Sequence, residues 1–251
     1  MVNTNQGKII VIVLSFLFSV FVNANDNSIG KISFIIGAQN EIKMKNAEEP
    51  GWKSARLYAK VKNNDQIQTQ TESRCEVKLN DGSTIRIGEK SKFTFTEASD
   101  SPQKRSFSSL LSWGRIWANV RKVNRSYNQF QITAPAAVCA VRGTIYRMES
   151  DSTTRIMVYD GEVDVGPAAT SQDSTPVPSP PKNLQPQEIQ GPYEIPGPYE
   201  VTLDHWIRIV KGFQIEIRPD GKYAKSEIDE ETDQNSEWVR WNQQRDAVRR
   251  D

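Results

Sequence analysis

The sequence is poor in the residues that bind metals or act as catalytic bases. It contains one histidine, His205, and two cysteines, Cys75 and Cys139. A zinc site needs three or four clustered ligands, so this set predicts none. The sequence also lacks a His-Glu-x-x-His helix, a nucleophile elbow, a phosphate-binding glycine loop and a calcium loop. We therefore expect that the protein binds no metal and no cofactor and is not an enzyme. A glycosidase with two carboxylates far apart in sequence is the alternative.

An excess of charge of either sign is also absent. The chain has 32 Lys and Arg residues against 31 Asp and Glu residues. This balance gives no electrostatic reason to expect nucleic acid or an anionic membrane as a partner. Charged residues make up 25% of the chain and hydrophobic residues 37%, which argues against wholesale disorder and favours one modest core.

Long apolar runs are absent except at residues 9–22. Lys8 precedes this run, which ends at Val22-Asn23-Ala24 with residues that suit a signal peptidase. The run is short for a membrane span, which needs about 20 apolar residues. Its layout is typical of a secretory signal peptide. We predict that residues 1–24 direct export and are removed, leaving no membrane span; an uncleaved N-terminal anchor in the inner membrane is the alternative.

Export permits a disulfide bond between Cys75 and Cys139, because the compartments outside the cytoplasm are oxidising. Both residues lie in predicted strands. The alternative is two small buried thiols. Nothing in the sequence places the two side chains at bonding distance, so both interpretations stay open.

Residues 29–165 show the alternation typical of half-buried strands. In Cys75–Leu79 the apolar side chains at every second position share one face and the charges share the other. Asp81-Gly82 then supplies a turn, and Asp160-Gly161 supplies another within a final hairpin. Many short strands at close spacing predict an all-β domain of antiparallel strands, arranged as a sandwich, roll or solenoid.

Prolines mark the end of this domain. Nine of the 13 prolines lie between residues 167 and 198. Since proline removes a backbone donor, residues 167–190 are predicted to be an extended linker. Two units, Gly191-Pro192-Tyr193-Glu194 and Gly197-Pro198-Tyr199-Glu200, follow it. They are interpreted as short edge strands or, alternatively, as a peptide or glycan contact through their tyrosines.

Residues 191–251 are predicted to form a small C-terminal region of strands with a terminal helix. The helix is expected over 236–251, with Ser236 as its N-cap and with Trp238 and Trp241 on the face that docks on the β domain. Residues 203–211 fit either a short helix or a strand. The acidic stretch 227–233 is expected to be solvated.

Several motifs occur in an order that resembles the FecR-like periplasmic domain. The two most specific are Val141-Arg142-Gly143-Thr144 and, after it, Asp160-Gly161-Glu162-Val163. The resemblance covers about 140 residues. It departs from the family at Asp65-Gln66, where Gly-Asp is usual, and at Cys139, where a smaller residue is usual. The other matching pieces are Trp52, Asp65–Thr69, Ser73–Ser83, Gly114–Trp117, Thr133–Ala140, Ile145–Tyr146 and Tyr159.

The resemblance implies a non-catalytic, exported periplasmic interaction or signalling-related module, whose partner is another envelope protein. A cell-wall or glycan-binding envelope protein is the alternative. Only about eight residues precede the apolar run, which leaves no room for the sigma-factor-binding segment of the family's regulators. The regulator role itself is therefore not expected.

Two groups of side chains are candidates for partner contact. The first is Arg142 with Gly143 and Thr144, in which the arginine either pins neighbouring strands or a turn or recognises an anionic group. The second is Trp113 and Trp117, which either stack on sugars or an acidic partner or belong to a solvated strand face. The second group lies among further cations and one aromatic residue, namely Arg115, Arg121, Lys122, Arg125 and Tyr127.

Overall fold

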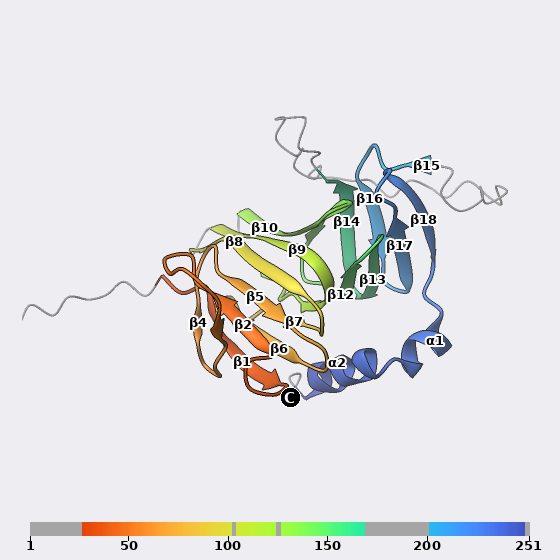
Figure 1. Ribbon diagram of the computed structural model, residues 1–251. Helices are drawn as coiled ribbons and strands as arrows, with labels where there is room; N and C mark the ends of the chain where they lie inside the picture. Colours follow the sequence, from red (N-terminus) through yellow and green to blue (C-terminus); the bar gives the residue numbers. More distant parts are fainter. Residues whose placement is uncertain (1–26, 102–103, 124–126, 169–200, 249–251) are drawn as a thin grey trace, which may run out of the picture.

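The computed structural model describes residues 27–101, 104–123, 127–168 and 201–248 (Figure 1). Strands make up most of these residues, as the alternation of apolar and polar side chains predicts. The predicted signal peptide, all but the first two residues of the predicted linker, and both Gly-Pro-Tyr-Glu units lie outside the described residues.

The strands form two layers, here called sheet A and sheet B. Sheet A begins at one edge with the short strand β4 and ends at the other with β18 and β15. In spatial order its strands are β4 (Lys60–Val61), β1 (Gly30–Ile36), β6 (Arg74–Leu79), β7 (Thr84–Ile87), β9 (Lys104–Asn119), β12 (Ile145–Ser150), β13 (Thr154–Asp160), β17 (Phe213–Ile217), β18 (Lys222–Glu227) and β15 (Val201–Thr202).

Sheet B lies opposite and shares β9 with sheet A. Its pairs are antiparallel except for β9 and β10, which run parallel. In spatial order its strands are β3 (Lys53–Ser54), β2 (Ile42–Lys45), β5 (Gln66–Thr69), β8 (Lys92–Asp100), β9, β10 (Tyr127–Ala134), β11 (Ala137–Val141), β14 (Glu162–Pro167) and β16 (Ile207–Val210).

Strand β9 passes from one layer to the other at Gly114. Its first part pairs with β8 in sheet B, and its last part pairs with β7 and β12 in sheet A. Gly114 has φ +94°, and a side chain there would collide with Ser91, whose Cα lies 2.4 Å from the Cβ position. Only glycine fits this bend. The 16-residue length of β9 therefore departs from the short strands that the sequence predicts.

A single apolar core lies between the layers. It runs from Ile32 in β1 to Ile217 in β17 and includes Phe93, Phe95 and Ile116, all fully buried. Each such side chain contributes about 1.5–3 kcal/mol on burial. The prediction of an all-β fold with a terminal helix is confirmed. Figure 1 also shows that the sequence advances from one end of the body to the other as strands are added.

The C-terminal strands continue both layers. Strand β16 pairs with β14 in sheet B, and β17 pairs with β13 in sheet A. Of the two forms open for residues 203–211, the strand is the one observed at Ile207–Val210.

Two helices, α1 (Glu230–Asn235) and α2 (Glu237–Ala247), follow β18 and run along one side of the body (Figure 1). Ser236 is the N-cap residue of α2, although its side chain makes no capping hydrogen bond. The docking predicted for the two tryptophans is confirmed. Trp238 is 2% exposed and packs in one cluster with Trp117, and Trp241 packs against the same cluster. The expectation of a solvated stretch at 227–233 is wrong at Asp233, which is buried beside Arg147.

Candidate protein-docking face

The two tryptophans of β9 that the sequence groups together lie on opposite sides of the molecule. Trp113 is 44% exposed on the outer face of sheet B, whereas Trp117 is 1% exposed under α2 on the outer face of sheet A. The bend at Gly114 separates them, because β9 changes layer there. The structure therefore does not bring these two rings into one surface.

Trp113 ends a row of side chains that crosses sheet B. The register places Lys43 opposite Gln68, Gln68 opposite Lys92, and Lys92 opposite Trp113. Directly opposed residues in antiparallel strands point to the same face. Their neighbours Met44, Ile67 and Phe93 point into the core. The row therefore lies on the outer face of sheet B.

A second tryptophan completes this surface. The Lys92 Nζ atom lies 5.3 Å from the ring centroid of Trp113 and 6.0 Å from that of Trp52, which is 37% exposed. A cation held between two indole rings gains from both ring faces. We call the set of Lys43, Trp52, Gln68, Lys92 and Trp113 the tryptophan–lysine face.

A second cross-strand row lies beside the first. It consists of Lys45, Gln66, Thr94 and Leu110, and Leu110 is 36% exposed. In the described part of the chain, neither Lys43 nor Lys92 forms an ion pair. The surface thus presents unneutralised cations together with exposed aromatic and aliphatic groups. This combination suits a partner that is both apolar and acidic.

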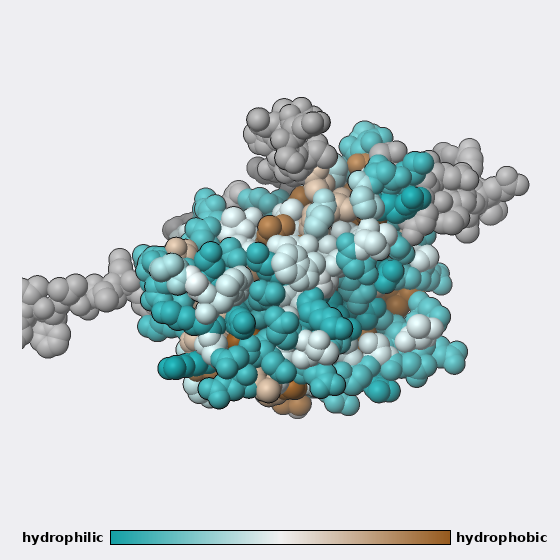
Figure 2. All heavy atoms as spheres, in the orientation of Figure 1, coloured by the Kyte–Doolittle hydropathy of each residue, from teal (hydrophilic) through white to brown (hydrophobic). Residues whose placement is uncertain are grey.

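Exposed apolar residues are otherwise sparse on the side of the molecule that Figure 2 shows. That side is mainly hydrophilic, and its hydrophobic residues form small separate areas. Single exposed apolar residues are normal on soluble proteins. Paired exposed tryptophans around a lysine are more informative, because tryptophan is enriched where proteins bind one another.

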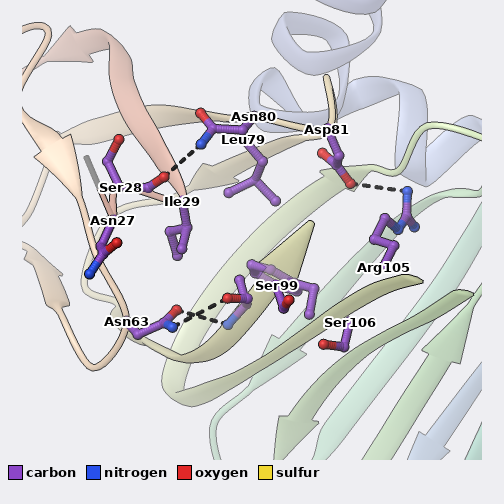
Figure 3. A pocket seen from close by; sticks show the side chains of 12 residues that line it. Asn27, Ser28, Ile29, Asn63, Leu79, Asn80, Asp81, Ser99, Arg105 and Ser106 are labelled. Atoms are coloured by element: carbon purple, nitrogen blue, oxygen red, sulfur yellow. Dashed lines mark hydrogen bonds and ion pairs between the residues drawn. The ribbon is translucent and has the colours of Figure 1, made fainter. Parts of the chain in front are cut away.

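A cavity of about 420 Å³ lies between the ends of sheets A and B (Figure 3). Several of its polar side chains hydrogen-bond to the protein itself. Asn63 bonds twice to the backbone of Ala98, Asn80 donates to the Ser28 carbonyl over 2.6 Å, and Asp81 lies 3.0 Å from Arg105. These contacts hold loops together, whereas the buried hydroxyl of Ser106 has no hydrogen-bond partner in the described structure.

The Val-Arg-Gly-Thr motif forms the corner between β11 and β12. Gly143 has φ +75°, and a Cβ there would lie 2.6 Å from the Cβ of Lys122. Thr144 is buried and donates to the Glu162 carbonyl over 2.7 Å. Arg142 is exposed, so it does not pin strands from within the sheet. The glycine and threonine thus shape the corner, while the arginine faces solvent.

Cys75 and Cys139 are both buried free thiols, on β6 of sheet A and β11 of sheet B. The structure contains no disulfide between them in the residues described. Burial, with a smaller effect of the neighbouring Glu76 charge, raises the pKa of Cys75 to about 12. Burial alone raises the pKa of Cys139. Both groups are therefore protonated and unreactive in the folded protein at neutral pH.

The remaining cations of the Trp113–Trp117 segment do not gather on the tryptophan–lysine face. Arg115 pairs with Glu89 over 2.9 Å on the side of sheet A, and Arg121 and Lys122 are exposed beyond the end of β9. Arg125 lies outside the described residues. His205 is exposed, and no group of three metal-binding side chains occurs among the residues described.

Sequence reasoning did not group Lys43, Trp52 and Lys92 with Trp113. The alternation in β2, β5 and β8 places their polar residues outward, but only the pairing register brings them into one row.

Comparison with known proteins finds one matching family model and two similar solved structures. Residues 65–164 match the family model described as FecR protein. Two crystal structures of a "putative anti-sigma factor" from Parabacteroides distasonis ATCC 8503, at 2.50 Å and 1.65 Å resolution, are 15% identical in sequence, with TM-scores of 0.44 and 0.43. Each match covers 65% of this chain but only 60% of the other. No curated protein matches the sequence.

Proposed function

We propose that the protein is an exported, non-catalytic, signalling-related module that docks another envelope protein, a role supported by the match of residues 65–164 to the FecR family model. The docking surface is the tryptophan–lysine face. The observation that carries the proposal is the placement of Lys92 between the exposed rings of Trp52 and Trp113.

The energetics of this face favour protein binding. Two indole rings that are 37% and 44% exposed leave apolar area in contact with water, and a partner recovers the corresponding free energy by covering it. The rings also hold Lys92, so less side-chain entropy is lost when its ammonium meets a carboxylate. Rigid aromatic anchors beside a cation are typical of binding hot spots.

The proposed compartment is the periplasm. The predicted signal peptide and the family resemblance together favour the periplasm. In the described ranges, no helix is long and apolar enough to cross a membrane.

Site-specific crosslinking tests this function. A photoreactive amino acid is placed at Leu110, which is 36% exposed in the row beside Trp113, so that both indole rings stay in place. A matched variant carries it at Asp220, an exposed turn residue between β17 and β18. With the full chain in its host, we expect one discrete protein adduct from position 110, none from position 220, and recovery of the protein in the periplasmic fraction. Exported protein that yields no adduct at position 110 contradicts the proposal.

A glycan-binding function is the second candidate, since exposed Trp52 and Trp113 also suit stacking on sugar rings. Trp117 does not serve this function in the described structure, because it is buried. Co-sedimentation with purified peptidoglycan separates the two functions. Binding to peptidoglycan that requires Trp113 favours the glycan-binding function. A protein that stays in the supernatant excludes that function.

A further inference from the structure

A second row of side chains crosses the outer face of sheet A. The register sets Phe34 opposite Glu76, Glu76 opposite Arg86, Arg86 opposite Trp117, and Trp117 opposite Arg147. We call this set of five residues the arginine row. Glu76, Arg86, Trp117 and Arg147 lie inside the segment that matches the FecR family, and the helices that cover them lie outside it.

Helix α2 contacts the arginine row through hydrogen bonds and an ion pair. Arg86 is fully buried and bonds to Glu76 over 2.7 Å, to the Asp246 carboxylate over 2.7 Å, and to the backbone and side-chain oxygens of Asn242, each over 3.2 Å. The other oxygen of Asp246 accepts from the Trp117 indole over 2.8 Å. One helical carboxylate is thus held by two residues of the row.

Arginines also surround the tryptophans of α2. Arg74 lies 5.0 Å from the ring centroid of Trp241, and Arg115 lies 5.2 Å from that of Trp238. In the preceding helix α1, Asp233 pairs with Arg147 over 2.7 Å. The face therefore selects a helix with two indole rings three residues apart followed by a carboxylate at the position of Asp246.

Three observations indicate that α2 is a replaceable occupant. Its apolar contacts belong to a small cluster of Trp117, Trp238 and Val239, separate from the core between the layers. The buried indole N–H of Trp238 has no hydrogen-bond acceptor in the described structure. A cavity of about 470 Å³, lined by Tyr159, Gln243 and others, adjoins α2. Imperfect packing and an unpaired donor both weaken its attachment.

We infer that the outer face of sheet A is a second docking surface, held closed by α2, and that it binds a helix of another protein with the aromatic and acidic groups of α2. Local opening of a segment with few core contacts requires less free energy than global unfolding. Opening of α2 exposes Arg86 and Trp117, and release of α1 with it also exposes Arg147, the partner of Asp233. An incoming carboxylate replaces Asp246 on Arg86. This surface is distinct from the tryptophan–lysine face, so the two assignments fail or hold separately.

Hydrogen exchange on the full chain tests whether α2 opens. We expect the amides of α2 to exchange at least about tenfold faster than those of β6 and β7. Asp246→Asn should accelerate amide exchange in α2 by a further factor of about 100, because it breaks a buried ion pair. Glu237→Gln is the matched control: its ion pair with Arg74 is on the same helix but Glu237 is 63% exposed, so exchange should stay nearly unchanged.

Binding of a synthetic peptide of residues 229–248 to the full chain tests what the face accepts. The peptide should bind the Asp246→Asn variant at least about tenfold more tightly than wild type, because the face is open more often. A peptide lacking both tryptophans should not bind. If Asp246→Asn does not fold, Asp233→Asn serves as the loosened variant.

Exchange of α2 only together with the core strands overturns the inference. So does failure of the peptide to bind a folded, loosened variant. Dimers that swap α2 between copies would assign the face to a second copy of this chain, and contradict the assignment to another protein.

Discussion

The Nη2 atom of Arg86 lies 2.7 Å from the Oδ1 atom of Asp246, so strand β7 and helix α2 share a buried ion pair although the two residues are 160 positions apart. Arg86 is 0% exposed, and its side chain has two carboxylates and one amide as partners. Breaking a buried ion pair leaves an uncompensated charge, which is why this contact dominates the attachment of α2.

Replacement of Arg86 by alanine should lower the free energy of unfolding by about 3 kcal/mol, because Glu76 and Asp246 then lose their shared cation. Glu237→Gln removes only an exposed ion pair and should change the free energy of unfolding by about 0.5 kcal/mol or less. Urea unfolding of both variants measures the difference. Equal losses would show that burial does not distinguish the two pairs.

Truncation of the two tryptophans of β9 should lower the free energy of unfolding by very different amounts. Trp117→Ala removes a buried ring that stacks on Tyr159 at 4.4 Å and donates to Asp246, and should lower the free energy of unfolding by about 3–5 kcal/mol. Trp113→Ala removes an exposed ring and should lower it by about 1 kcal/mol or less. Thermal and urea unfolding check both values. A large loss for Trp113→Ala would mean that the ring serves stability more than docking.

Gly114 and Gly51 provide a matched test of the bend in β9, since both have φ +94°. A Cβ at Gly114 meets Ser91, whereas nothing lies within 4 Å at Gly51. Gly51→Ala should lower the free energy of unfolding by about 1–2 kcal/mol, from backbone strain alone. Gly114→Ala adds the collision with Ser91 and should lower it by at least about 3 kcal/mol. Similar stabilities for the two variants would show that the strand does not need this close approach.

The buried thiols predict a loss of stability at high pH. Cys75 keeps its proton up to a pKa of about 12 in the folded state, against an ordinary value of 9.0. Folded-state stabilisation from the thiol is complete below about pH 9 and falls as the pH rises toward 12, by about 1.4 kcal/mol per pH unit per thiol.

Urea unfolding at pH 8 and pH 10.5 checks this prediction against a Cys75→Ala, Cys139→Ala variant, which should lose less stability over the same interval. Iodoacetamide should label neither cysteine in the native protein and both in denaturant. Rapid labelling of native Cys75 would contradict its burial.

The local pattern of apolar, polar and turn residues is enough to predict much of the fold. Cys75–Leu79 alternates, Asp81-Gly82 and Asp160-Gly161 turn the chain, and the β-rich architecture follows from such segments. The terminal helix and its docked tryptophan were also predictable, because Trp238 and Trp241 are spaced three residues apart.

The surfaces were not predictable, because they depend on pairing between distant strands. Lys92 meets Trp52 only through the order β3, β2, β5 and β8, and Asp233 meets Arg147 only after the C-terminal helices fold back. The acidic stretch 227–233 has the composition of a solvated loop. The carboxylate of Asp233 is buried because two partners, Arg147 and Tyr159, bind it.

The affinity of the protein crosslinked at position 110 for the wild-type chain and for Trp113→Ala tests the central claim most directly. We expect the substitution to weaken binding at least about tenfold, with the free energy of unfolding changed by about 1 kcal/mol or less. A Trp113→Ala variant that binds this partner as tightly as wild type would contradict the assignment of the tryptophan–lysine face.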